Sequence, residues 1–308
     1  MKVSMIGGTG FVGSYITDQL IAAGHTPRLL VRSGSEHKIK QSQHCELVTG
    51  DISQREALLK TLEGTDAVIY LIGILREEPS KNITFEKLQY QGVVNTITAS
   101  QTQEVKRFIL MSANGVKKGG TAYQDTKARA EEALQASDRD WTIFRPSVIF
   151  GDPRGCMEFA TQLQKELIKS PIPAPLFFPG ISIMQAGEFK MAPVAVENVA
   201  SAFVQSLEKP EMIRQIYPLC GNMALSWNDI IQKISIASGR GSKLALPVPA
   251  ALIQPIAGLM ERFPWFPITK GQITMLLEGN QCHSHAAFEL LDIHPKQFEV
   301  KELQYLME

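Results

Sequence analysis

The sequence predicts an α/β fold: a doubly wound parallel sheet followed by a smaller, mainly helical C-terminal lobe. One observation is that short apolar runs alternate with helical patterns along the first half of this 308-residue chain. Another is that a glycine turn, spaced G-x-x-G-x-x-G from Gly7 to Gly13, directly follows the first apolar run, Val3–Ile6. Repeated strand–helix units form parallel sheets covered on both faces. Together these observations predict a Rossmann sheet.

The elements of the first half follow in strict alternation. The expected strands are Val3–Ile6, Arg28–Val31, Glu46–Thr49, Ala67–Leu71, Arg107–Met111 and Trp141–Arg145. The expected helices are Phe11–Ala23, Gln54–Leu62, Thr84–Gln101 and Tyr123–Ala136. In such sheets ligands bind beyond the carboxyl ends of the strands. The residues that follow each strand are therefore the candidates for function.

The alternation ends after Phe150, where proline-rich loops surround one helical pattern near Glu158–Lys169. We expect a dinucleotide-binding domain at 1–150 and a smaller substrate or lid lobe at 151–308, which closes over the cofactor. Segments such as 193–208 are expected to return to the first domain. Helical patterns in this half are Val196–Leu207, Ser226–Ser238, Ala250–Arg262, Lys270–Glu278 and the C-terminal tail.

Charge and cysteine content limit the function. Lys plus Arg and Asp plus Glu number 31 each, which argues against a general nucleic-acid binder because such proteins need a basic surface. The first strand begins at Lys2 or Val3, so we expect no signal peptide. The cysteines are scattered without a C-x-x-C pair, which favours a reducing, cytoplasmic setting over a disulfide framework. They are Cys45, Cys156, Cys220 and Cys282.

The glycine turn predicts phosphate binding. Gly7 can take the positive φ of a tight turn, and Gly10 lets the backbone approach a pyrophosphate. Gly13 lets the helix pack closely on the strand, and the helix N-terminus aims its free N–H groups at the phosphates. We expect the cofactor to contact this turn through Gly7, Thr9, Gly10, Phe11, Val12 and Gly13.

Arg32 follows the second strand and bears on the choice of cofactor. Dinucleotide folds that prefer NAD place an acidic residue here to accept the ribose 2′-hydroxyl. An arginine can instead pair with a 2′-phosphate. The sequence therefore favours NADP(H), with NAD(H) possible. A solvated loop arginine is the alternative interpretation.

The third and fourth strands each end in a candidate contact. Asp51 could accept a hydrogen bond from the adenine amino group, with Ile52 against the ring face. A cap for the helix near Gln54 is an equal alternative for Asp51. Leu71 and Gly73 follow the fourth strand, where a glycine permits close approach to the cofactor ribose. A simple turn is the competing interpretation of Gly73.

The chemistry is expected at Tyr123 and Lys127. Their i, i+4 spacing places both side chains on one helical face. A lysine ammonium and an oxidised nicotinamide both favour the phenolate, so we expect the pKa of Tyr123 to be lowered. Lys127 can also hold the cofactor ribose. The alternative is a half-buried tyrosine at a helix start with a solvated lysine.

The chain resembles the extended and atypical short-chain dehydrogenase/reductases. More narrowly, it resembles bacterial relatives of the nucleotide-binding accessory subunit of mitochondrial respiratory complex I. The motifs that carry the broader resemblance are Gly7–Gly13, Gly50–Asp51, Met111–Ala113, Tyr123–Lys127 and Arg145–Gly151. The narrower resemblance depends on Tyr70–Leu75, Ser112–Gly115, Asp140–Pro146, Met191–Ala200 and the segment beginning Leu225–Trp227.

The resemblance implies a bound NAD(P)(H) and a tyrosine that exchanges a proton while hydride moves to or from the nicotinamide. It adds Pro146 and Val148 as cofactor contacts. Active relatives carry a catalytic Ser or Thr at the position of Ala113, so that Ser112 is a helper one residue early. Gln89 stands where relatives have a helper Asn. Atypical branches of the family often bind the cofactor without known turnover.

Two other features suggest different roles. His283 and His285 beside Cys282 resemble metal ligands, but zinc needs three or four, and the sequence shows no second cluster, so we expect no metal. The segment Ala250–Met260 could lie on a membrane surface. We favour a core wall or the lid of an apolar pocket. The longest apolar stretch, Leu244–Met260, is too short and too interrupted for a span.

The leading hypothesis is an NADP(H)-dependent oxidoreductase acting on an apolar carbonyl or quinone-like small molecule. Tyr123 would be the acid/base, Lys127 would tune its pKa, and Ser112 would assist. One alternative is a non-catalytic cofactor-binding protein for assembly or regulation of a respiratory complex. Another is a nucleotide-sugar epimerase or dehydratase, which normally holds NAD, so that Arg32 counts against it. No nucleic-acid partner is expected, and association with a membrane surface or a respiratory complex stays open.

Overall fold

The computed structural model describes residues 1–180, 182–263 and 266–307, which form two compact units. We call them unit 1 and unit 2. Unit 1 contains residues 1–146, 196–219 and 285–294, and unit 2 contains residues 147–195, 220–284 and 295–308. The chain therefore crosses between the units several times, and the segments 196–219 and 285–294 belong to the unit that holds the N-terminal half.

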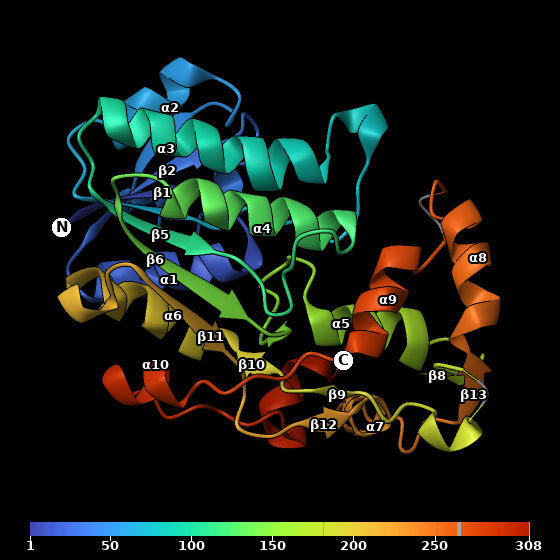
Figure 1. Cartoon of the computed structure of the whole chain (residues 1–308). Coiled ribbons are helices and arrows are strands. Elements are labelled where there is room, and N and C mark those ends of the chain that lie inside the picture. The colour runs from blue at the N-terminus through green and yellow to red at the C-terminus, as the bar shows by residue number, and fades with distance from the viewer. Residues whose placement is uncertain (181, 264–265, 308) are drawn as a thin grey trace. The chain divides into compact units, whose positions relative to one another are not determined.

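Unit 1 is built on one parallel sheet with the order β11-β6-β5-β4-β1-β2-β3 (Figure 1). Sequential strands run outward in one direction from β1 to β3 and in the other from β4 to β11. The direction of winding therefore reverses between β1 and β4, which is where doubly wound sheets bind ligands. The strands are β1 (Lys2–Ile6), β2 (Thr26–Val31), β3 (Glu46–Thr49), β4 (Ala67–Tyr70), β5 (Arg107–Met111), β6 (Asp140–Pro146) and β11 (Gln215–Leu219).

Helices cover both faces of this sheet, α2, α3 and α4 on one side and α1 and α6 on the other (Figure 1). The α/β prediction is thus confirmed. The single helix expected at Thr84–Gln101 is instead a π-helical segment, Glu86–Gln91, continued by α3. The helices of unit 1 are α1 (Phe11–Ala22), α2 (Arg55–Leu62), α3 (Gly92–Thr102), α4 (Ala122–Gln135), α6 (Val196–Gln205) and α10 (His285–Leu290).

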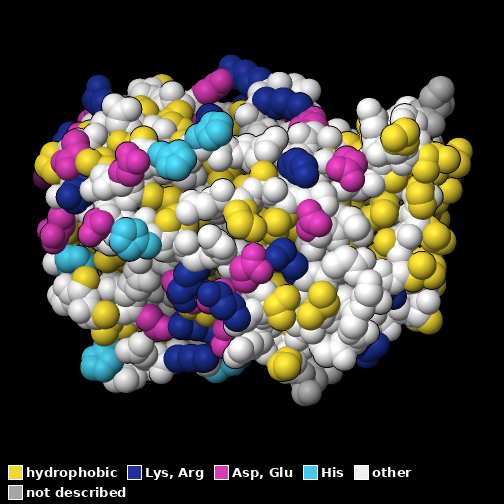
Figure 2. Space-filling model, turned by 90° about the horizontal axis from the view of Figure 1, so that it is seen from below, with side chains coloured by type: hydrophobic (Ala, Val, Ile, Leu, Met, Phe, Trp, Pro, Cys, Tyr) yellow, Lys and Arg dark blue, Asp and Glu magenta, His cyan; other side chains and the backbone are white. Residues whose placement is uncertain are grey.

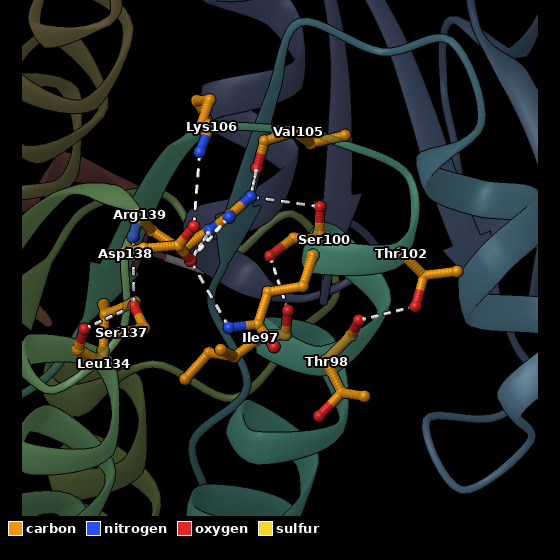
Figure 3. A network of polar contacts seen from close by, with 11 residues as sticks. Ile97, Thr98, Ser100, Thr102, Val105, Lys106, Leu134, Ser137, Asp138 and Arg139 are labelled. Atoms are coloured by element: carbon orange, nitrogen blue, oxygen red, sulfur yellow. Dashed lines mark hydrogen bonds and ion pairs between the residues drawn. The ribbon is translucent and has the colours of Figure 1, made fainter.

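A buried arginine ties the amino ends of β5 and β6 to α3. Arg139 is 3% exposed and donates hydrogen bonds to the carbonyl oxygens of Ser100 (3.2 Å) and Val105 (2.9 Å). Its guanidinium also bonds the Asp138 carboxylate at 2.6 Å, and Lys106 reaches the same carboxylate (Figure 3). Arg139 thereby satisfies a carbonyl oxygen in the last turn of α3 and holds that turn beside the amino ends of β5 and β6.

Unit 2 combines short strand pairs with helices around its own core. Trp227, Ile230, Ile231 and Ile234 of α7 pack with Phe150 and Phe298 in that core. A helical C-terminal part was predicted and is present. Its elements are β7 (Ile149–Phe150), α5 (Phe159–Leu163), β8 (Ala174–Phe178), β9 (Lys190–Met191), β10 (Val194–Ala195), β12 (Leu225–Ser226), α7 (Trp227–Ala237), β13 (Ala245–Pro249), α8 (Ala250–Met260) and α9 (Lys270–Glu278).

The expectation that Ala250–Met260 forms a core wall is wrong for most of its surface. Only Ala250 and Ala257 of α8 are buried, and they pack with Ile273 of α9. Leu252 and Leu259, by contrast, are 66% and 62% exposed. Apolar side chains gather at the right of Figure 2, where α8 and β13 lie. Within the described part of the chain, no helix has the length and apolar character needed to cross a membrane.

The expectation of reduced cysteines is also wrong for one pair. Cys220 and Cys282 form a disulfide with their Cα atoms 5.7 Å apart. Cys220 directly follows β11, where the chain enters unit 2, and Cys282 lies three residues before the chain returns to unit 1 at His285. The bond therefore closes the base of the segment 220–284. Sequence spacing did not reveal it, because 62 residues separate the two thiols.

Candidate functional site

The glycine turn lies at the carboxyl end of β1, beside the point where the strand order reverses. Gly7 has φ of +100°, a left-handed conformation that favours glycine. An added Cβ at Gly13 would lie 2.4 Å from the carbonyl oxygen of Gly7, so no larger residue fits there. At Gly7 it would lie 3.2 Å from the backbone nitrogen of Ile72, which follows β4. The turn thus brings the ends of β1 and β4 together.

The N-terminus of α1 is left without a side-chain cap. Gly10 is the capping residue and is exposed, an added Cβ there would lie 3.4 Å from the Gly7 carbonyl oxygen, and the first turn holds no acidic side chain. Free N–H groups and the positive end of the helix dipole therefore face outward from this turn, which fits a pyrophosphate. Thr9 and Phe11 are half-buried beside it, and Val12 is buried under the turn.

Arg32 follows β2 and its side chain is exposed. Burial raises the pKa of the Asp51 carboxyl, but hydrogen bonds from Ser53 and the charges of Lys87 and Arg32 outweigh it and lower that pKa. The effect means that two cations, Arg32 and Lys87, lie near the Asp51 carboxylate at the carboxyl end of the sheet. The sequence singled out Arg32 but missed Lys87, which lies on the π-helical segment 86–91.

The structure favours neither of the two interpretations weighed for Asp51. Its carboxylate accepts hydrogen bonds from the backbone nitrogen (3.0 Å) and the hydroxyl (2.7 Å) of Ser53. Gln54 is the N-cap residue of α2, and no side chain caps the N-terminus of this helix. Asp51 therefore stabilises the turn before α2. Ile52 is 4% exposed and belongs to the core of unit 1.

Lys127 is buried between the ends of β4 and β5. Its side chain is 5% exposed, and its Nζ donates a hydrogen bond to the carbonyl oxygen of Met111 at 3.1 Å. An added Cβ at Gly73 would lie 3.6 Å from Nζ, an ordinary contact distance, so the ammonium lies beside the backbone that follows β4. Burial lowers the pKa of Lys127 to about 8, against the opposing charge of Glu131. The alternative of a solvated lysine is therefore wrong.

The start of α4 fixes the position of Lys127 and Tyr123. Thr121 and Gln124 form a reciprocal capping box at the helix N-terminus. The Gln124 side-chain nitrogen also donates to the carbonyl oxygen of Gly115 at 2.9 Å, which holds the loop after β5 against the helix. The capping box fixes the residue at which α4 starts. The side chains of Tyr123 and Lys127, four residues apart, therefore project from the same face of the helix.

Tyr123 is half-buried next to Lys127. The Lys127 Nζ lies 5.8 Å from the centroid of its ring, and the Phe85 ring packs edge-on at 5.8 Å between centroids. Burial raises the pKa of the Tyr123 hydroxyl above its usual value. The expected lowering of that pKa is therefore wrong for the protein alone, because burial removes water from the phenolate and disfavours the charged form. At neutral pH Tyr123 holds its proton.

Ser112 lies in a small buried hollow with Lys127. The hollow is lined by Tyr70, Ile72, Gln89, Val93, Leu110, Met111, Ser112, Lys127 and Ala130. Ser112 is 4% exposed, and its hydroxyl has no hydrogen-bond partner among the described residues. Gln89 donates to the carbonyl oxygen of Ile74 (2.8 Å) and accepts from the Thr126 hydroxyl (3.1 Å). It thereby joins the loop after β4 to α4, one residue before Lys127.

The remaining candidates lie in two different units. Pro146 ends β6 in unit 1, and its carbonyl oxygen accepts from the backbone nitrogen of Asn114 at 2.8 Å. Leu71 is buried and donates its backbone N–H to the carbonyl oxygen of Ile6 at 2.9 Å. Val148 belongs to unit 2, where its carbonyl oxygen accepts from Val194. The structure thus places most candidates at the carboxyl ends of the strands of the unit 1 sheet.

No metal site is found in the parts of the chain that the structure describes. No group of three His, Cys, Asp or Glu side chains is placed to hold an ion there. Cys282 is oxidised in its disulfide with Cys220, so its sulfur is not available as a thiolate ligand.

Comparison with curated proteins finds relatives across most of the chain. The photosystem II assembly factor Ycf39 of Synechocystis sp. is 27% identical over 100% of this chain and 90% of its own length. The 40 kDa subunit of mitochondrial NADH-ubiquinone oxidoreductase from Neurospora crassa is 25% identical over 86% of this chain and 67% of its own length. The resemblance to atypical short-chain dehydrogenase/reductases and to the complex I subunit is confirmed.

Solved structures share the fold. UDP-glucose 4-epimerase of Thermus thermophilus, determined with NAD, aligns with a TM-score of 0.71 at 16% identity, covering 99% of this chain and 97% of the epimerase.

A family model described as NAD(P)H-binding matches residues 7–173, which is more than half of the chain. That match begins at the glycine turn and includes Lys127 and Tyr123. The chain therefore belongs to the NAD(P)H-binding family of Rossmann proteins, with a nicotinamide cofactor.

Proposed function

We propose that this protein is an NADP(H)-dependent oxidoreductase that acts on an apolar carbonyl or quinone-like small molecule. The observation that carries the proposal is the placement of Lys127. Its buried ammonium contacts the backbone after β5 and lies beside Gly73 after β4, with Tyr123 one turn away. A buried lysine at this edge costs stability, so a functional role is the simplest reason for it.

Different residues of unit 1 bind the cofactor and transfer the proton. The turn Gly7–Gly13 and the N-terminus of α1 bind the pyrophosphate, and Lys127 binds the ribose hydroxyls. A nicotinamide held there would supply the hydride chemistry of the reaction. Tyr123, which keeps its proton at neutral pH, donates that proton to the substrate oxygen as the carbon–oxygen double bond is reduced. Solvent then returns the proton to Tyr123.

Tyr123→Phe tests the catalytic role. It removes the proton and keeps the ring, so turnover with a carbonyl and quinone panel should fall by about 10²-fold or more while cofactor affinity stays unchanged. Tyr217→Phe, a half-buried tyrosine on β11, is the matched control and should keep full activity. Equal turnover by the wild type and Tyr123→Phe would contradict the assignment.

The preference for NADP(H) is supported by Arg32 and Lys87. Both cations lie near the carboxyl end of the sheet, where they would pair with a 2′-phosphate. Arg32→Glu should weaken NADPH binding by roughly tenfold or more and leave NADH binding little changed, as measured by titration calorimetry. Lys60→Glu, at an exposed lysine on α2, makes the same charge reversal away from this edge. Tighter binding of NADH than NADPH by the wild type would exclude this preference.

A second candidate function is cofactor binding in the assembly or regulation of a respiratory complex. It is supported by the relatives, which are named as an assembly factor and as a complex subunit. It is also supported by Ala113, which offers no hydroxyl, while that of Ser112 is buried in the hollow. Tight NADPH binding with no absorbance change across the whole panel would favour it. Turnover restored by Ala113→Ser would support a dormant enzyme instead.

A further inference from the structure

Unit 2 presents an exposed aliphatic surface. On α8, Leu252, Ile256 and Leu259 are 66%, 51% and 62% exposed. Their spacing of four and three residues places them on one side of the helix. The opposite side holds Ala250 and Ala257, which pack on Ile273 of α9. The burial pattern thus leaves the larger apolar residues outside, the reverse of what a soluble helix does.

The surface continues onto the two-stranded sheet that precedes α8. Leu244 and Leu246 are 66% and 49% exposed, and Ile172 is 70% exposed. Leu246 pairs with Pro175 across the sheet, and the Leu244 carbonyl accepts from the backbone nitrogen of Ala174, two residues after Ile172. We call the six residues Ile172, Leu244, Leu246, Leu252, Ile256 and Leu259 the apolar face. Hydrophobic side chains are dense at the right of Figure 2, where α8 and β13 lie.

Charges are absent from the middle of this face and present at its borders. No Asp, Glu, Lys or Arg occurs between Leu244 and Met260. Lys243 precedes the stretch, and Arg262 follows it with its guanidinium 4.9 Å from the centroid of the Phe263 ring. The stem of Lys270 packs against α8, since an added Cβ at Gly258 would lie 3.4 Å from its Cδ. The acidic neighbour is Glu261, whose carboxylate accepts from the backbone nitrogen of Lys270.

This arrangement matches a lipid bilayer better than a protein. Protein interfaces carry about one hydrogen bond per 100–200 Å² to fix their orientation. The apolar face consists of aliphatic side chains, and Gln254, the polar side chain of α8, is turned to Thr274 of α9. A bilayer interior needs no directional partners, and the basic border fits anionic headgroups through lysine and arginine stems that extend to the surface.

We propose that the apolar face docks the protein on the surface of an anionic lipid bilayer, with α8 lying in the plane of the interface. The helix has 11 residues, a length of about 16 Å, so it can lie among the headgroups and cannot cross the hydrocarbon core. This inference goes beyond the proposed function and does not depend on catalysis or on cofactor binding.

Vesicle flotation tests the proposal with the full chain. Wild-type protein should float with vesicles of phosphatidylcholine and phosphatidylglycerol (about 3:1) and bind pure phosphatidylcholine vesicles more weakly. The double variant Leu252→Glu/Ile256→Glu should bind the anionic vesicles roughly tenfold or more weakly. Arg262→Gln/Lys270→Gln should lose the preference for anionic vesicles and keep the residual binding to neutral ones.

Ile236→Glu is the matched control. Ile236 is 50% exposed on α7 and lies outside the apolar face, so this variant should float as the wild type does. Unchanged thermal unfolding of each variant excludes misfolding as the cause of lost binding. Failure of the wild type to float, or equal flotation of the control and the double variant, overturns the proposal. A concentration-dependent dimer that Leu252→Glu/Ile256→Glu abolishes, without vesicle binding, assigns the face to a second copy instead.

Discussion

Unit 1 and unit 2 use apolar and polar residues in opposite ways. In unit 1 the large exposed hydrophobic residues are Met1, Leu47 and Leu75, and charged residues such as Lys127, Glu131, Arg107 and Arg139 are buried. In unit 2 large aliphatic residues are exposed on α8 and β13, while the core is aliphatic and aromatic. Arg107 and Arg139 are held by hydrogen bonds to backbone carbonyls, whereas Lys127, at the carboxyl ends of the strands, is the buried charge to which we assign a ligand. Exposed aliphatic residues indicate a surface for association.

The units also differ in what restricts them. Unit 1 depends on glycines that permit close backbone approach at the ends of β1 and β4. Unit 2 has a covalent bond at the base of the segment 220–284. The glycines of unit 1 act through close packing in the folded state. The disulfide of unit 2 acts by restricting the conformations of the unfolded chain. Four predictions test this difference.

The largest effect is expected from Gly13→Ala. Its Cβ would lie 2.4 Å from the Gly7 carbonyl oxygen and 2.7 Å from the Gly8 Cα, both of which are backbone atoms that cannot move aside cheaply. We expect a loss of about 5 kcal/mol or more in the free energy of unfolding of unit 1, together with loss of NADPH binding. Chemical denaturation and titration calorimetry measure these quantities.

Gly24→Ala is the control for Gly13→Ala. Gly24 also belongs to unit 1 and has φ of +76°, but no atom lies within 4 Å of its added Cβ. Only backbone strain of about 1 kcal/mol should result, with NADPH binding intact. If Gly13→Ala and Gly24→Ala lower the free energy of unfolding by the same amount, the close backbone approach at Gly13 has no special role.

The disulfide should contribute nearly as much, but to unit 2. Closing a loop of 62 residues restricts the unfolded chain and stabilises the fold by about 4 kcal/mol in the chain-entropy account. Cys220→Ser/Cys282→Ser should therefore speed hydrogen exchange in peptides from α7 while those from β1 and β5 keep their protection. Cys45→Ser/Cys156→Ser, at two cysteines outside the disulfide, should change neither. Faster exchange throughout unit 1 as well would show that the two units unfold together.

Lys127→Met should stabilise unit 1 and abolish its function. Because burial lowers the pKa of Lys127 to about 8, the ammonium costs free energy at pH 7, and methionine removes that cost. We expect a gain on the order of 1–3 kcal/mol at pH 7 with a marked loss of NADPH affinity. The unfolded chain keeps its proton up to about pH 10.4, so the advantage of the variant should shrink as the pH rises from about 8. A destabilised variant would contradict a functional origin of the buried charge.

The smallest effect is expected in the pH profile of carbonyl reduction. Tyr123 keeps its proton because burial raises its pKa, whereas Lys127 loses its charge above about pH 8. Reduction should therefore fall roughly tenfold per unit above that pH. Lys127→Arg, which stays charged, should remove the fall in rate while lowering the maximum. A rate that stays constant up to pH 10 in the wild type would show that the proton transfer does not need the charge of Lys127.

The elements of unit 1 could be predicted closely, but one strand could not. Glu46–Thr49 and Arg107–Met111 are strands with the predicted bounds. The strand β11 (Gln215–Leu219) was not predicted, because it pairs only with β6 at the sheet edge and contains Pro218, which lacks a backbone N–H. Pro218 interrupts its short apolar run, Ile216 to Leu219, so the pairing with β6 makes it a strand.

Candidate site residues could be chosen from their position along a strand, and their roles stay predictions. The residues that follow β1, β2, β4 and β5 could be chosen because parallel strands end at one edge. The direction of the Tyr123 pKa shift could not, because it depends on how much water the folded chain removes from the phenol. Lys87 was not chosen as a candidate, and Gln89 was named only through the family resemblance; both lie on the π-helical segment 86–91.

The sequence by itself predicted that a dinucleotide is bound, because glycine is required wherever backbones approach each other closely and those positions can be read from the order of residues. Only the tertiary structure decided that Cys220 meets Cys282, that Lys127 is buried, and that α8 turns its leucines outward. Each of these depends on contacts between residues far apart in the chain. Local patterns record which side of a helix is apolar, and only packing decides whether that side is covered.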